Sequence, residues 1–115
     1  MIRRLSIAAA IIVALAWPGA ARAQDAEKGK KVYESAAPKC KVCHSIGGVG
    51  NAKGSLDDVG SKLSAADIKA WVRTPKEMTA KAKAERKPPM PAYTKEKLPD
   101  ADLDALAGYL ASLKK

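Results

Sequence analysis

The sequence is poor in the large side chains from which a hydrophobic core is usually built. Phenylalanine is absent, and aromatic residues make up only 4% of the 115 residues. Alanine contributes the largest share of the 47% apolar content. A chain of this length forms one domain at most, and one with so few bulky residues has little apolar surface to bury. We therefore expect something other than ordinary side-chain packing to hold the fold together.

Cysteine and acidic residues are also scarce. Two cysteines cannot make the multi-bridge disulfide framework that stabilises many small exported proteins. Twelve acidic residues face 21 basic ones, which gives a net charge of +9. Such a charge is compatible with nucleic-acid binding, but the chain lacks a stripe of alternating aromatic and basic residues. We therefore expect no nucleic-acid partner.

The first segment, residues 1–23, has the pattern of a secretory signal peptide. Arg3 and Arg4 precede an apolar stretch over residues 5–17, and an Ala-x-Ala cleavage pattern follows at residues 21–23. This stretch of 13 residues, broken only by Ser6, is shorter than the roughly 18–20 residues that a membrane span needs. The pattern predicts export to the periplasm without stable membrane insertion. An uncleaved membrane anchor is the alternative.

Cleavage after residue 23 leaves a single predicted domain, residues 24–115, with a net charge of +6. Helices are expected at Asp25–Ala36, Ser64–Arg73 and Asp100–Leu113. The second begins with a capping-box pattern, and the third carries one apolar stripe because leucines recur at spacings of three, four and three.

The segments between these helices show no helical or β periodicity. Residues 45–60 are rich in glycine and read as loop. Residues 76–87 are rich in Lys and Ala without an apolar stripe, which favours a solvated segment over a short helix. Prolines at 88, 89 and 91 predict an extended stretch. The predicted fold class is all-α.

The most informative motif is Cys40-Lys41-Val42-Cys43-His44. A redox dithiol usually lies in a βαβ unit, which this chain lacks, and a zinc site would need a second pair of ligands, whereas His44 is the only histidine. The remaining site type is c-type haem attachment. Two cysteines three residues apart can add to the two vinyl groups of one haem, and the adjacent histidine can then reach the iron. A simple disulfide or free thiols are the alternative.

Haem iron has a second axial position, and a methionine is the candidate because no second histidine exists. Met1 leaves with the signal peptide, so Met78 and Met90 remain. Met90 lies in Pro88-Pro89-Met90-Pro91, where prolines stiffen the chain around the thioether. Met78 lies in the Lys-rich segment and is expected to pack or be exposed. Core filling is the alternative for either methionine.

With these residues, the chain resembles a small bacterial class I cytochrome c over its whole mature length. The resemblance rests on the CxxCH motif, on Met90-Pro91-Ala92-Tyr93, and on Leu106-Ala107-Gly108-Tyr109-Leu110. It implies a mostly helical fold whose loops wrap one covalently attached haem c, with Cys40 and Cys43 as thioethers and His44 and Met90 as axial iron ligands. It also implies that the N- and C-terminal helices cross, with Gly29 and Tyr109 at the crossing.

Two further expectations come from the resemblance. Trp71, and with it Arg73, matches a bacterial segment whose side chains hydrogen-bond a haem propionate; the alternative is a core aromatic and a solvated charge. The loop after the motif normally contains a Gly-Pro pair, and here Gly54 stands in the place of the proline. In the family, a backbone carbonyl of this loop accepts the Nδ1–H of the proximal histidine.

Iron with both axial positions filled suits one-electron transfer rather than catalysis. The expected function is therefore that of a soluble, monomeric periplasmic electron carrier, not an enzyme. A cytochrome subunit held in a periplasmic dehydrogenase or oxidase complex is the alternative, and a haem enzyme or gas sensor would require Met90 to be off the iron. Lysines flanking the motif and the Met90 loop predict redox partners with acidic docking surfaces: Lys39, Lys41, Lys53, Lys76, Lys81, Lys83, Lys87, Lys95 and Lys97.

Overall fold

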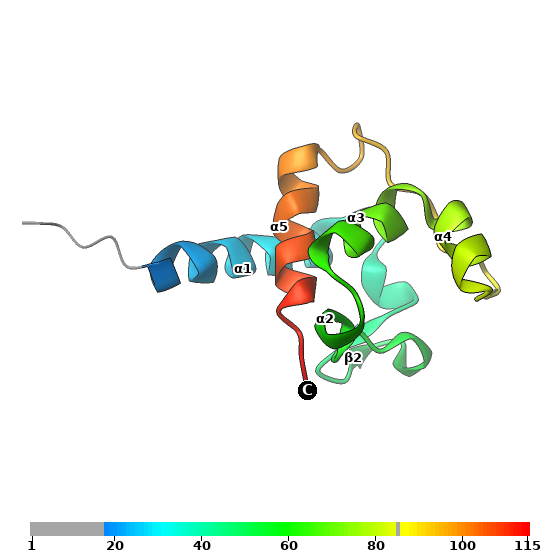
Figure 1. Ribbon diagram of the computed structural model, residues 1–115, viewed down its shortest axis with the longest axis horizontal. Coiled ribbons are helices and arrows are strands. Elements are labelled where there is room, and N and C mark those ends of the chain that lie inside the picture. Colours follow the sequence, from blue (N-terminus) through cyan, green and yellow to red (C-terminus); the bar gives the residue numbers. More distant parts are fainter. Residues whose placement is uncertain (1–17, 85) are drawn as a thin grey trace, which may run out of the picture.

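The computed structural model describes residues 18–84 and 86–115 and is mostly helical (Figure 1). The two long helices form the frame, and the shorter elements lie between them in the sequence. In chain order the elements are α1 (Pro18–Ser35), the 3-10 turn η1 (Cys40–Val42), β1 (Ser45–Ile46), β2 (Val49–Gly50), the 3-10 turn η2 (Ala52–Gly54), α2 (Val59–Lys62), α3 (Ala65–Arg73), α4 (Pro75–Ala82) and α5 (Asp100–Ala111).

The first and last helices cross, as the resemblance implies, and α1 and α5 are the most closely packed pair of elements (Figure 1). A Cβ placed on Gly29 of α1 would lie 2.2 Å from the carbonyl oxygen of Ala105 and 2.5 Å from the Cβ of Tyr109. Real Cβ atoms do not approach other atoms so closely. The absent side chain of Gly29 therefore allows the two backbones to meet.

The core lies under α5, against α1 and α3. The predicted leucine stripe is confirmed: Leu103, Leu106 and Leu110 are buried, and Leu113 is half-buried just beyond the end of the helix. Val32 of α1 and Ile68 of α3 belong to the same buried cluster. Every large member of this cluster is aliphatic or tyrosine, in keeping with the absence of phenylalanine.

Helix α3 begins as predicted, whereas the segment after it differs from the prediction. Ser64 caps α3: its hydroxyl accepts a hydrogen bond from the Asp67 N–H at 3.1 Å, and the Asp67 carboxylate accepts from the Ser64 N–H. The next residues were expected to be a solvated segment but form helix α4. Pro75 occupies the first position of that helix, where a fixed φ and a missing N–H cost nothing. Pro75 is also buried, which anchors a helix whose other residues are exposed or half-buried.

The glycine-rich stretch 45–60 was expected to be loop, but it contains a small hairpin and two helical turns. Ser45 pairs with Gly50 and Ile46 with Val49, and the two residues of the turn, Gly47 and Gly48, both have positive φ. Two-residue hairpin turns of this kind favour glycine. Strands of two residues are too short to produce a visible alternation of apolar and polar residues.

Helix α1 begins before the predicted start at Asp25. Residues 18–23, assigned to the signal peptide from sequence, form its first turns, because a proline opens a helix well and mostly helix-favouring residues follow. Residues 1–17 of the predicted signal lie outside the described residues. Within residues 18–84 and 86–115, no helix has the length and apolarity that crossing a bilayer requires.

Candidate functional site

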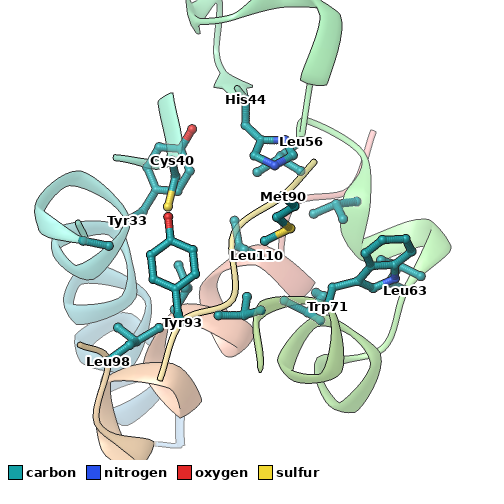
Figure 2. Close-up of a pocket in the computed structure, with 15 residues that line it drawn as sticks. Tyr33, Cys40, His44, Leu56, Leu63, Trp71, Met90, Tyr93, Leu98 and Leu110 are labelled. Carbon is teal, nitrogen blue, oxygen red and sulfur yellow. The ribbon is translucent and has the colours of Figure 1, made fainter. Parts of the chain in front are cut away.

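Two adjoining cavities lie in the body of the molecule. An inner cavity of about 140 Å³ and an outer one of about 610 Å³ share four lining residues: His44, Leu56, Trp71 and Met90. The inner cavity reaches the apolar core, and its wall consists mostly of hydrophobic side chains (Figure 2). Its lining residues are Tyr33, Ala36, Cys40, His44, Leu56, Val59, Leu63, Ile68, Trp71, Val72, Met90, Tyr93, Leu98, Leu106 and Leu110.

The CxxCH motif lies along one side of these cavities as a tight turn. The N–H groups of Cys43 and His44 both donate to the carbonyl of Cys40, at 3.1 and 2.9 Å, so three chemically active side chains are held in η1 and the two residues that follow it. Cys40 lines the inner cavity and Cys43 the outer one, and both are half-buried. Burial raises the pKa of the Cys40 thiol.

The hairpin after the motif holds this turn in place. Asn51 follows β2, and its N–H donates to the carbonyls of Lys41 and His44 at 3.1 and 3.0 Å. Gly50 has a φ of +113°, and a Cβ there would lie 2.1 Å from the His44 carbonyl oxygen. The glycine-rich stretch therefore holds the motif in place through backbone contacts and is not an irregular loop.

The imidazole of His44 is oriented by the backbone of η2. Its Nδ1 lies 2.9 Å from the carbonyl oxygen of Gly54, and a carbonyl can only accept, so Nδ1 carries the proton and the Nε2 lone pair remains for a metal. The expected carbonyl contact is thus present without the usual proline. Burial lowers the pKa of His44, which favours the neutral imidazole that binds metals.

The two methionines are placed differently by the fold. Met90 is half-buried and lines both cavities together with His44 (Figure 2). Met78 lies on α4, also half-buried, and lines neither cavity. The structure therefore brings Met90, and not Met78, to the cavity that His44 faces.

Two tyrosines of the inner cavity were not identified as site residues from the sequence. Tyr93 donates its hydroxyl to the carbonyl of Pro38 and points toward Cys40 (Figure 2). Burial raises the pKa values of both tyrosines, that of Tyr33 to about 12. The Tyr33 hydroxyl is the only buried side-chain nitrogen or oxygen without a hydrogen-bond partner in the described part of the chain. Aromatic residues spaced around a motif give no sequence signal that would distinguish them from core residues.

Trp71 and Arg73 separate in the structure. Trp71 lines both cavities, and its contact with a propionate stays a prediction. Arg73 instead donates to the carbonyl of Tyr93 and to the carboxylate of Asp100, both at 2.9 Å, so it is neither at the cavity nor simply solvated. A different arginine, Arg86, lines the outer cavity and donates to the Lys53 carbonyl at 3.1 Å.

The residues present fit a haem better than a bare metal ion. Within residues 18–84 and 86–115, no three His, Cys, Asp or Glu side chains gather as an ion site would require. The apolar inner cavity suits a flat apolar ring, while Lys53, Arg86 and Lys87 give the outer cavity a basic wall that suits carboxylates. His44 presents a neutral nitrogen donor with a fixed orientation.

Comparison with known proteins agrees with this site. The cytochrome c family profile matches residues 26–114, which is nearly the whole of the chain after the predicted signal peptide. A comparison with curated proteins gave no significant match, and a comparison with solved structures gave none either. Cys40 and Cys43 lie in the attachment motif that this family uses. The chain belongs to the cytochrome c family and is an electron-transfer protein with a covalently attached c-type haem.

Proposed function

We propose that this chain is an exported, soluble one-electron carrier whose haem iron is held between His44 and Met90. The observation that carries the proposal is that both side chains line the same two cavities, with the His44 Nδ1–H already committed to the Gly54 carbonyl. The signal-peptide pattern of residues 1–23 supports a periplasmic location.

The chain's own residues have separate parts in this function. Cys40 and Cys43 form the thioether links, and Trp71 is a candidate partner for a propionate. The bound haem supplies an iron that changes by one electron between two oxidation states. A thioether ligand from Met90 favours the reduced state and raises the potential, and the apolar wall of the inner cavity disfavours added charge at the metal.

Ligation of the iron by Met90 also argues against catalysis at the haem. With a protein ligand on each side of the iron, no position stays open for oxygen, peroxide or carbon monoxide. Members of the family generally act as carriers rather than enzymes, and this ligand set supports the same role for this chain.

The distribution of charge supports docking to acidic redox partners. Among the described residues, every ion pair uses an aspartate of α5 or Asp57. Lys95 is one of the paired lysines, at 3.7 Å from Asp100. The lysines near the motif and the outer cavity have no carboxylate within 4 Å in the described part of the chain and remain available to a partner: Lys39, Lys41, Lys53 and Lys87.

The exposed apolar surface favours a free monomeric carrier over a subunit held in a complex. In the described part of the chain, Val42 and Val49 are the only large hydrophobic residues that are exposed, at 66% and 68%. Permanent interfaces bury large apolar areas, whereas two exposed valines, one of them next to Lys41 in the sequence, suit brief, salt-sensitive encounters. Co-purification with a larger redox subunit would instead support the alternative.

The proposal is tested by absorption spectra of the purified holoprotein in both oxidation states, with Met90→Ala and Met78→Ala as a matched pair. The wild type and Met78→Ala should show the weak near-infrared band of methionine-ligated ferric iron and should not bind carbon monoxide rapidly when reduced. Met90→Ala should lose the band, bind carbon monoxide and have a lower potential. Loss of the band in Met78→Ala alone, or rapid carbon monoxide binding by the wild type, would contradict the ligand assignment.

A further inference from the structure

Tyr93 links the loop that carries Met90 to the rest of the molecule through three hydrogen bonds. Its backbone N–H donates to the Val72 carbonyl at 3.0 Å, and its own carbonyl accepts from Arg73 at 2.9 Å. Its hydroxyl donates to the carbonyl of Pro38, beside Cys40. Tyr93 is only 5% exposed. One residue, three positions after Met90, therefore connects the loop to α3 and to the segment preceding the CxxCH motif.

Arg73 is the charged centre of this arrangement. One of its amino groups donates to the Tyr93 carbonyl and the other to the Asp100 carboxylate, each at 2.9 Å. Its side chain is 19% exposed, which makes it far less solvated than the lysines in the neighbouring ion pairs. The guanidinium holds the pKa of Asp100 below its usual value. The planar fork of arginine suits two acceptors at once, and a lysine would reach only one of them well.

We propose that Arg73 and Tyr93 are positioning residues that hold the Met90 thioether in the cavity facing His44, and so set how readily another ligand replaces it. The inference rests on the proposed role of Met90 as an axial ligand. The prolines at 88, 89 and 91 restrict the local backbone of the loop, but they do not connect it to other elements. The three contacts of Tyr93 do, and they lie at the end of the loop that leads into α5.

The chain offers a matched control for the ion pair of Arg73. Lys69 pairs with Asp104 at 2.5 Å, and this contact joins the same two helices, α3 and α5, as the contact between Arg73 and Asp100. Among the described residues, Lys69 forms no hydrogen bond or ion pair with the Met90 loop. Arg73→Gln and Lys69→Gln therefore each remove one charge and one α3–α5 ion pair, but only the former releases the Tyr93 carbonyl.

The test is a titration of the ferric holoprotein with imidazole, which competes with Met90 for the iron. Arg73→Gln should bind imidazole about tenfold more tightly than the wild type, equivalent to about 1.4 kcal/mol, because a hydrogen bond to a charged group no longer opposes opening of the loop. Its methionine–iron band should weaken at elevated temperature before global unfolding. Lys69→Gln should match the wild type in both readouts. Equal behaviour of Arg73→Gln and Lys69→Gln would overturn the proposal.

Four further variants make the result specific. Tyr93→Phe keeps the ring and loses only the hydroxyl contact with Pro38, so it should bind imidazole a few-fold more tightly, whereas Tyr109→Phe, on α5 outside both cavities, should not. If Arg73→Gln does not mature into a holoprotein, Arg73→Lys takes its place because it retains the charge. Imidazole affinity equal to that of the wild type in both Arg73→Lys and Tyr93→Phe would also overturn the proposal. Met90→Ala separates the two proposals: an unchanged imidazole affinity there shows that Met90 is not the ligand.

Discussion

At the scale of single residues, the site depends on Gly54 having no side chain. Gly54 presents its carbonyl to the Nδ1–H of His44 at 2.9 Å, and its own α-carbon lies against the motif backbone. A Cβ there would be 2.0 Å from the Cys43 carbonyl oxygen and 3.0 Å from His44 Nδ1. The backbone of Gly54 is not left-handed, so only the space available makes glycine necessary.

Gly54→Ala should therefore disturb the site through a steric clash alone. We expect a loss of about 1–3 kcal/mol in the free energy of unfolding, the usual cost of forcing extra atoms into a packed position. The lost or lengthened bond to His44 should also raise the redox potential, because the imidazole becomes a weaker donor. Denaturant unfolding and potentiometry of the holoprotein measure these effects. Ser55→Ala, one residue further along, is the control, and equal stability of the two variants would contradict the steric argument.

How far these residues could be predicted from the sequence depended on chemistry that is local along the chain. The CxxCH spacing and the proline-flanked Met90 are contiguous patterns, and both were assigned to the site. Tyr93 and Arg86 were missed because their parts depend on contacts across 55 and 33 sequence positions, with Pro38 and Lys53. Such contacts leave no local pattern.

At the scale of secondary-structure elements, the strongly patterned helices were predicted and the weakly patterned segments were not. The capping box of α3 and the leucine stripe of α5 are complete signals by themselves. Helix α4 has no apolar stripe, and it forms because Pro75 starts it and is buried against the rest of the molecule. The hairpin at 45–50 forms where the next residue, Asn51, donates its backbone N–H to the motif. Tertiary contact decides both cases.

For the crossing helices α1 and α5, we predict that replacing glycine by alanine changes the stability in opposite directions at two positions. An alanine in mid-helix is ordinarily worth about 1 kcal/mol over glycine. At Gly108 of α5 a Cβ would have nothing within 4 Å, so Gly108→Ala should stabilise the protein by about 0.5–1 kcal/mol. At Gly29 the same change places a Cβ 2.2 Å from the Ala105 carbonyl, so Gly29→Ala should destabilise it by about 1–3 kcal/mol.

Denaturant unfolding of the two alanine variants under identical conditions provides the measurement. Each acts as the control for the other, because both replace a helical glycine and differ only in what the new methyl group meets. Stabilisation by Gly29→Ala would mean that the helices do not approach closely at that point. A loss of stability in Gly108→Ala would mean that its exposed face is covered.

At the scale of the whole molecule, basic side chains differ by location in whether they pair with a carboxylate. The carboxylates of Asp100, Asp102 and Asp104 on α5 pair with basic side chains of α1, α3 and the segment before α5. Lys53 and Lys87 instead line the outer cavity, next to His44 and Met90, and have no carboxylate within 4 Å among the described residues. Among the described residues, this positive charge at the outer cavity has no carboxylate partner, and we propose that electrons enter or leave there.

The location of this charge, rather than its total, should control the rate of reaction with anionic partners. We expect Lys53→Gln with Lys87→Gln to lower the second-order rate of oxidation by hexacyanoferrate(III) several-fold at low salt, because steering by charges at a cavity raises association rates. The control is Lys30→Gln with Lys31→Gln on α1, an exposed pair that lines neither cavity and changes the net charge by the same amount. Its rate should stay close to that of the wild type.

Ionic strength is the second variable of this experiment. The difference between the cavity double variant and the wild type should shrink as salt rises, since exposed charges are screened beyond about 8 Å at 0.15 M. The reaction should be followed by stopped-flow absorbance of the haem at several salt concentrations. If both double variants slow equally at every concentration, the rate reports net charge alone, and the cavity lysines have no special part in docking. A deficit confined to Lys53 and Lys87 that fades with salt locates the docking surface at the mouth of the outer cavity.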